Sequence, residues 1–145
     1  MTSPYFNQLN IINSYSTALN YNSDQHAYIR LDNINVTSAG DCLYVYISTS
    51  NTINSTIEIN NFSGQGCSGL IIYNYVYSPL VAFVNIQNAN LIGTNGITLN
   101  GYSGMSVVIN NSSIINSTSY GILANVPIVQ IENSIISGTV NQYAY

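Results

Sequence analysis

A five-residue pattern recurs along this chain and limits the folds that it can adopt. Each copy has an apolar, a variable, an apolar and a polar residue followed by asparagine, as in residues 107–111 (VVINN). The asparagines that close the copies recur every 22 to 28 residues, at Asn33, Asn61, Asn88, Asn111 and Asn133. Repeats with a period in this range are typical of solenoid proteins, in which each repeat packs mainly on its neighbours.

A second pattern follows the first at a nearly constant distance. Its copies begin nine to eleven residues after an asparagine of the first pattern, at residues 43–46 (LYVY), 70–73 (LIIY), 97–100 (ITLN) and 122–125 (ILAN). Gly69, Gly96 and Gly121 precede three of these copies. The N-terminal region holds a divergent unit, because residues 7–14 (NQLNIINS) match residues 110–117 (NNSSIINS) at several positions. The chain therefore contains about six repeat units, the last of them incomplete.

Both patterns alternate with the period of two that β-strands show. Isoleucine, valine, threonine and tyrosine, which favour strands, are abundant, and glycine, asparagine and serine cluster between the patterns, where turns are expected. No segment has a sustained helical period. The sequence therefore predicts an all-β chain: a single-stranded parallel β-helix (solenoid) of about six coils, stacked about 4.8 Å apart. Residues 1–145 are expected to form one domain.

Stacked coils place equivalent residues in columns along the solenoid axis. The residues expected to face inward are Ile29, Leu31, Leu43, Val45, Ile57, Ile59, Leu70, Ile72, Val84, Ile86, Ile97, Leu99, Val107, Ile109, Ile122, Val129 and Ile131. The five asparagines of the first pattern should form a ladder of side-chain amides at a turn, where Asn61 and Asn111 are expected to be inaccessible. Arg30 and Glu58 hold the same outward register in adjacent coils, so we expect them to form an ion pair.

The Ile-x-Asn repeats and phrases such as residues 96–100 (GITLN) resemble those of the right-handed parallel β-helix proteins, the pectin-lyase-like superfamily. The resemblance covers roughly residues 5–140 and identifies no single family. Members of the superfamily include polysaccharide lyases and hydrolases, viral tailspikes and surface adhesins. Its enzymes carry clustered acids, often with arginine or lysine and sometimes calcium, and this chain departs from that pattern.

Charged residues are nearly absent. The 145 residues include one arginine, no lysine and five acids, so 4% are charged, whereas about a quarter is usual. We expect no nucleic-acid partner, because phosphate binding needs lysine and arginine. Asp24 and His26 form the only close acid–histidine pair, and we assign them to a loop. The sequence predicts no catalytic residue, no metal site and no cofactor, and we expect the protein not to be an enzyme.

The sequence also bears on the location of the protein. No run of 18 apolar residues marks a transmembrane helix, and residues 1–4 (MTSP) lack the basic and apolar regions of a signal peptide. The alternatives are a signal that was removed, a fragment of a longer protein, and export by another route, for example on a virus particle. We expect an extracellular, cell-surface or virion protein.

Outward positions of the second pattern are rich in tyrosine. In two adjacent units these positions and their continuation hold Tyr44, Tyr46, Ile71, Tyr73, Tyr75 and Tyr77. An exposed aromatic surface of this kind usually marks an interface, because tyrosine has one apolar and one polar end. The alternatives are stacking against a carbohydrate and ordinary packing between coils.

The two cysteines occupy related positions in adjacent units. Cys42 immediately precedes one copy of the second pattern, and Cys67 lies three residues before the next. A disulfide between them would stabilise the fold by roughly 3 kcal/mol and would indicate an oxidising compartment or a hyperthermophile. The alternative is two buried free thiols.

Several asparagines lie in Asn-x-Ser/Thr sequons, which begin at Asn35, Asn54, Asn61, Asn110, Asn111 and Asn116. Two of these residues belong to the predicted ladder. Asn35, Asn54 and Asn116 are therefore the better candidates for glycosylation.

These features favour a non-enzymatic structural subunit of an extracellular assembly, such as a filament, a surface layer or a virion. So little charge and so many outward apolar side chains suit a monomer poorly. We therefore expect a homo-oligomer or filament that associates through the tyrosine-rich surface and the open ends of the β-helix. The alternative is a carbohydrate-binding module or a polysaccharide-cleaving β-helix enzyme, for which a glycan would be the partner.

Overall fold

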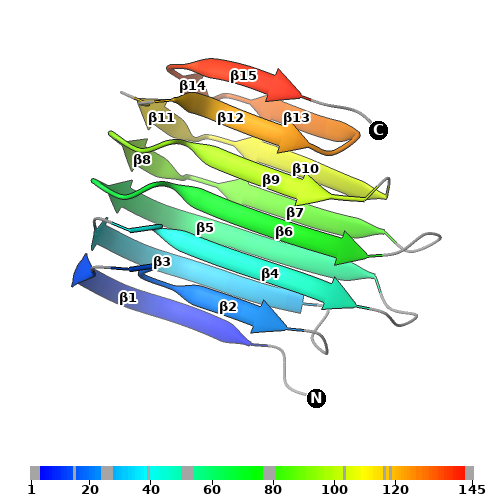
Figure 1. The fold of residues 1–145 in the computed structure, drawn as a ribbon, viewed down its shortest axis with the longest axis horizontal. Helices are drawn as coiled ribbons and strands as arrows, with labels where there is room; N and C mark the ends of the chain where they lie inside the picture. The colour runs from blue at the N-terminus through cyan, green and yellow to red at the C-terminus, as the bar shows by residue number, and fades with distance from the viewer. Residues whose placement is uncertain are drawn as a thin grey trace.

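A computed structural model describes residues 4–14, 16–23, 28–38, 40–49, 54–76, 81–102, 104–115, 117 and 119–142. These residues form a parallel β-solenoid with two sheets, and no helix occurs among them (Figure 1). The strands are β1 (Tyr5–Ser14), β2 (Asn20–Ser23), β3 (Tyr28–Ser38), β4 (Leu43–Thr49), β5 (Ser55–Gln65), β6 (Leu70–Val76), β7 (Ala82–Gln87), β8 (Asn90–Ile92), β9 (Ile97–Gly101), β10 (Met105–Asn110), β11 (Ser113–Ile115), β12 (Tyr120–Asn125), β13 (Ile128–Glu132), β14 (Ile135–Ile136) and β15 (Thr139–Gln142). The all-β solenoid predicted from the repeats is therefore confirmed.

Each turn of the solenoid contributes to both sheets. The six-stranded sheet has the order β15-β12-β9-β6-β4-β2, and the other sheet contains β1, β3, β5 and the later pairs of shorter strands. All pairings between turns are parallel, and β7 and β8 pair with the two halves of β5. The turns that begin with β3, β5, β7 and β10 lie between two neighbours. The predicted count of about six coils thus exceeds the roughly four turns that are stacked on both sides.

The apolar columns form the core between the two sheets. Every residue that was predicted to face inward from residue 29 to residue 122 is fully buried. Val129 and Ile131 in β13 are the exceptions: Val129 is only partly buried, and Ile131 is 38% exposed. The prediction that these two residues belong to the core overestimated their burial. In the described chain no strand covers β13 on the side away from β10.

The asparagine that closes each first pattern forms a sharp corner. Asn33, Asn61, Asn88, Asn111 and Asn133 all have left-handed backbones, with φ between 48° and 56°. Asparagine adopts this conformation more readily than other residues with a side chain, which explains its recurrence at the corner. Gln8, with φ of 57°, occupies the same position in the divergent first turn.

The predicted amide ladder is confirmed in part: it joins Asn33, Asn61 and Asn88, and it extends to Asn7 in the first turn. Asn33 Nδ2 donates to Asn7 Oδ1 at 2.9 Å, and the links from Asn61 to Asn33 and from Asn88 to Asn61 are both 3.0 Å. At the last corner, Asn133 Nδ2 donates to Asn110 Oδ1 at 3.3 Å. The expectation that Asn61 and Asn111 are inaccessible was wrong, because a left-handed corner turns these side chains to the outer surface, where both are exposed.

Glycine is required where the chain enters the six-stranded sheet. Gly69 and Gly96 have φ of 114° and 79°. A Cβ atom on Gly69 would lie 2.1 Å from the carbonyl oxygen of Gly96, and one on Gly96 would lie 2.1 Å from that of Gly121. The backbones of adjacent turns thus touch at this corner, which explains why glycine precedes the second pattern.

Candidate functional site

The first candidate site is an aromatic surface on the six-stranded sheet. In β4 and β6 the side chains alternate, so that Leu43, Val45, Leu70 and Ile72 enter the core and the residues between them face outward. The outward residues Tyr44, Tyr46, Ile71, Tyr73 and Tyr75 are half-buried. Tyr44 lies opposite Ile71, and Tyr46 lies opposite Tyr73. The parallel register therefore brings together residues that are about one repeat apart in the chain.

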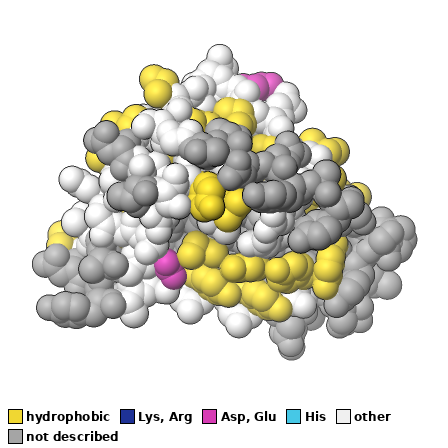
Figure 2. Space-filling view, turned by 45° about the horizontal axis from the view of Figure 1, so that its top comes forward, with side chains coloured by type: hydrophobic (Ala, Val, Ile, Leu, Met, Phe, Trp, Pro, Cys, Tyr) yellow, Lys and Arg dark blue, Asp and Glu magenta, His cyan; other side chains and the backbone are white. Residues whose placement is uncertain are grey.

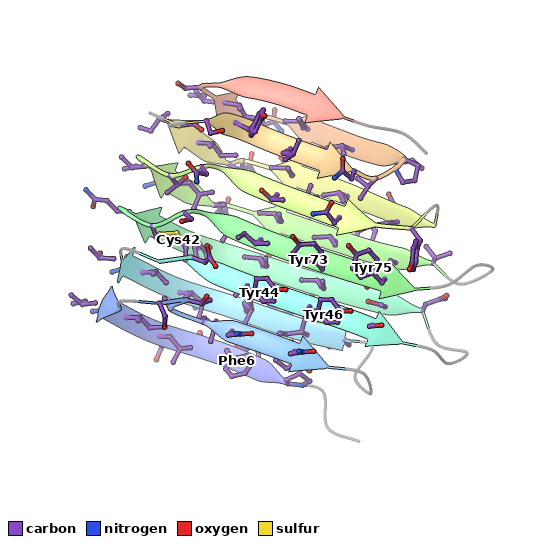
Figure 3. All side chains as sticks on the ribbon, in the orientation of Figure 1. Phe6, Cys42, Tyr44, Tyr46, Tyr73 and Tyr75 are labelled. Atoms are coloured by element: carbon purple, nitrogen blue, oxygen red, sulfur yellow. A yellow bond between two sulfur atoms is a disulfide. The ribbon has the colours of Figure 1, made fainter. Side chains whose placement is uncertain are left out.

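The rings of this surface contact one another. The ring centroids of Tyr44 and Tyr46 lie 5.7 Å and 6.2 Å from that of Tyr73, and Tyr46 and Tyr73 both lie 5.9 Å from Tyr75. The rings are tilted or edge-on, which are favourable geometries for aromatic pairs. Figure 3 shows Tyr44 and Tyr46 on β4, next to Tyr73 and Tyr75 on β6.

The structure adds Tyr102 to this surface. Its ring lies 5.1 Å from that of Tyr75, and 41% of the residue is exposed. Tyr102 was not predicted to lie here. Gly101 pairs with Asn74, so the residue after Gly101 continues the row of Tyr75. We define the tyrosine face as Tyr44, Tyr46, Ile71, Tyr73, Tyr75 and Tyr102. Tyr77, which was predicted to belong here, lies outside the described residues.

The tyrosine face is electrically neutral. Burial raises the pKa of Tyr44, and the neighbouring Tyr73, Tyr46 and Asp41 raise it further, so the Tyr44 hydroxyl stays protonated at neutral pH. A protonated phenol both donates and accepts hydrogen bonds. Figure 2 shows a band of hydrophobic side chains, a class that includes tyrosine in this view, from the centre to the right of the lower part of the molecule. The surface can therefore combine apolar contact with hydroxyl hydrogen bonds.

The second candidate site is a polar hollow on the outward face of the other sheet. Its volume is about 360 Å³, and it is lined by Arg30, Glu58, Asn60, Asn61, Asn85, Gln87 and Asn88. The hollow arises because polar residues alternate with core residues in β3, β5 and β7. Its lining offers amide donors and acceptors together with one carboxylate and one guanidinium group.

A network of charged side chains borders this hollow. Arg30 Nη1 lies 3.8 Å from Glu58 Oε2, so the predicted ion pair is present, but Arg30 Nε lies closer to Asp32 Oδ2, at 2.9 Å. The contact with Asp32 was not predicted, although Asp32 follows Arg30 by two residues and therefore lies on the same face of β3. Tyr28 donates to Glu58 Oε2 at 2.7 Å, and Tyr5 donates to Asp32 Oδ2 at 3.0 Å.

The network sets the protonation of Asp32. Burial alone would raise the pKa of Asp32, but hydrogen bonds from Asn60, Arg30 and Tyr5 outweigh it and lower the pKa below its usual value. A carboxyl whose pKa is lowered on folding stabilises the folded state above its unfolded pKa of about 3.9. That stabilisation is lost as the pH falls through the folded pKa.

We therefore expect Asp32→Asn to lower the free energy of unfolding at neutral pH, with a difference from the wild type that shrinks below about pH 4. Urea unfolding followed by circular dichroism at several pH values measures this difference. A difference that stays constant down to about pH 2 would contradict a role for the Asp32 charge.

The predicted disulfide between Cys42 and Cys67 is formed. The two Cα atoms are 5.3 Å apart, and the bond joins adjacent turns next to β4 and β6. Both residues are buried, at the corner where the chain enters the six-stranded sheet. The bond therefore ties the turn that carries Tyr44 to the turn that carries Tyr73.

The remaining candidate residues are placed as follows. Asn35 and Asn54 are exposed; Asn35 Nδ2 donates to Asn10 Oδ1 at 3.0 Å, and Asn54 Oδ1 accepts from the Val81 N–H at 2.9 Å. Asn116, Asp24 and His26 lie outside the described residues. Among the residues with described positions, no three His, Cys, Asp or Glu side chains gather as a metal site would need, and no helix has the length and apolar character to span a membrane.

Comparison with known proteins gives no family for this chain. A scan against family models, a search of curated proteins and a search of solved structures each found no match. The tyrosine face and the polar hollow are therefore the features that bear on function.

Proposed function

We propose that the protein is a non-enzymatic structural subunit of an extracellular assembly, such as a filament, a surface layer or a virion. The observation that carries this proposal is the tyrosine face, on which five tyrosine rings form one connected cluster on a strand surface that stays partly open to solvent. Partners that bury aromatic side chains gain apolar contact and can still hydrogen-bond the hydroxyl groups. Self-association through this face is the proposed role.

Two further properties support this proposal. The chain has only one basic residue and five acids, so charge repulsion between copies is weak. The Cys42–Cys67 disulfide is typical of proteins in oxidising environments, which include the cell exterior. The parallel solenoid also supports kinship with the pectin-lyase-like superfamily, whose members include surface adhesins and viral tailspikes, and we include that kinship in the proposal.

The tyrosine face can be tested by removing three of its rings. We expect Tyr44→Ser, Tyr46→Ser and Tyr73→Ser together to weaken self-association about tenfold or more, because aromatic residues at the centre of an interface supply much of its free energy. Sedimentation velocity over a range of protein concentrations measures the association, and circular dichroism checks that the strands persist.

Tyr120→Ser is the matched control for this experiment. Tyr120 is 39% exposed and begins β12 in the same sheet, outside the tyrosine face. This variant should associate as the wild type does. If the triple variant does so as well, the rings serve only to pack adjacent turns, and the proposed interface is wrong.

The polar hollow favours a second function, the binding of a neutral carbohydrate. Its asparagine and glutamine side chains, with Arg30 and Glu58, can donate and accept hydrogen bonds in the manner that sugar hydroxyl groups require. Measuring whether the wild type and the triple tyrosine variant bind neutral oligosaccharides discriminates the two functions. Saccharide binding by a protein that sediments as a monomer would favour the second function over the first.

A further inference from the structure

We infer that a second copy of this chain docks on the C-terminal end of the solenoid and places its β1 on β13 and β14 in the register that relates all the turns. The inference rests on the proposed self-association and identifies a second, axial contact for it. It predicts which residues of the two copies meet.

Within the described residues, each end turn has a strand edge that pairs with no other strand. Within the described chain β13 pairs only with β10, β14 only with β11, and β1 only with β3. A free edge leaves a row of backbone N–H and C=O groups that can pair with another strand. Because every pairing in the solenoid is parallel, the edges at its opposite ends are complementary.

A core column is also exposed at this end. The column that contains Phe6 at the N-terminal end continues through Leu31, Ile59, Ile86 and Ile109 to Ile131. The four middle residues are fully buried, whereas 38% of Ile131 is exposed. Continuing the register by one turn would place Phe6 of a second copy on Ile131 and cover it.

The neighbouring outward column is chemically matched as well. It runs from Asn7 through Asp32 and Asn60 to Glu132. Within the molecule, Asn60 Nδ2 donates to Asp32 Oδ1 at 2.8 Å across adjacent turns. Asn7 of the second copy would lie over the exposed Glu132 and could make the same amide-to-carboxylate bond.

The corners at the two ends have the same shape. Gln8 has φ of 57° and Asn133 has φ of 48°, so the second copy would turn where the first one turns. Beyond the corner, Ile11 would lie on Ile136 and Asn10 on Ile135, which is 68% exposed. No charged residue occurs in the described part of the first turn, so Glu132 meets no like charge there.

A second copy is the occupant that these matches favour, because the first turn of this chain is a variant of the same repeat that forms the last turn. The contact joins different surfaces of the two copies, so its repetition yields a filament rather than a closed dimer. The tyrosine face remains free for lateral contacts between such filaments.

The register can be tested with engineered cysteines in the full chain. Asn10→Cys with Ile135→Cys places two thiols in the predicted contact, where adjacent turns bring Cα atoms within reach of a disulfide, as the 5.3 Å between Cys42 and Cys67 shows. Asn10→Cys with Ser137→Cys is the matched control. Ser137 is exposed and lies two residues after Ile135, just beyond the end of β14, so its thiol is displaced by about 7 Å along the chain.

Under mild oxidation we expect the first variant to form a ladder of disulfide-linked multimers on a non-reducing gel, at least about tenfold more than the control. Equal cross-linking of both variants would overturn the register. If neither variant cross-links while association still depends on the tyrosine face, the axial contact is wrong and the proposed function stands. If the protein stays monomeric at all concentrations, both proposals fail.

Discussion

Gly96→Ala is expected to lower the free energy of unfolding by about 3 kcal/mol or more. Gly96 has φ of 79°, a conformation that alanine adopts only with strain. Its new Cβ atom would also lie 2.1 Å from the carbonyl oxygen of Gly121 and 2.5 Å from that of Tyr120. Both atoms belong to the backbone of the next turn, so the stack itself must shift. Urea unfolding followed by circular dichroism measures the loss.

Gly93→Ala is the control that separates strain from collision. Gly93 has φ of 63°, but a Cβ atom placed there meets no atom within 4 Å. We expect this variant to lose only about 1 kcal/mol, the strain of the left-handed backbone. Equal losses in the two variants would show that the close approach of the turns at Gly96 contributes nothing to stability.

Removal of the disulfide is the second change with a large expected effect. Replacing Cys42 and Cys67 by alanine should lower the free energy of unfolding by roughly 3 kcal/mol, because the bond restricts a segment of the unfolded chain whose ends are 25 residues apart. Alanine is the suitable replacement because both positions are buried. The unfolding midpoints of the wild type and the double variant in urea provide the comparison.

The reduced wild type is the internal control for this comparison. A reductant should bring its midpoint down to near that of the double variant and leave the midpoint of the variant unchanged. The double variant should also show weaker order at the tyrosine face, since the bond joins the turns of Tyr44 and Tyr73. A double variant as stable as the oxidised wild type would contradict a stabilising role for the bond.

The repeats predicted the core well because two independent signals agreed. Alternation assigned Ile59 and Ile86 to the inward face, and the repeat placed them in the same column, as their pairing and full burial confirm. The left-handed corners were marked in the same way, by an asparagine at a recurring position. Local pattern and period together therefore specified the fold class, the inward residues and the adjacent turns of the two cysteines.

Contacts between specific side chains were less predictable. Asn74 occupies an inward position and is fully buried, with its Oδ1 accepting from Ser55 Oγ at 2.9 Å, whereas its Nδ2 has no hydrogen-bond partner within the described chain. Nothing in the neighbouring sequence of Asn74 indicates this contact, because Ser55 belongs to a strand of the opposite sheet. Tyr102 and the closeness of Asp32 to Arg30 were missed for a related reason, since both depend on how side chains lie within and between adjacent turns.

The sequence by itself determined the solenoid, its inward columns and the corners at which it turns, because these features depend on periodicities of two residues and of one repeat. The tertiary structure alone decided which surface atoms meet: the connected rings of the tyrosine face, the network around Asp32 and the incomplete burial of Ile131. The physical reason is that a column is defined by backbone hydrogen bonds that repeat along the chain. A contact between two outward side chains depends instead on rotamers and on whether another turn lies beyond them.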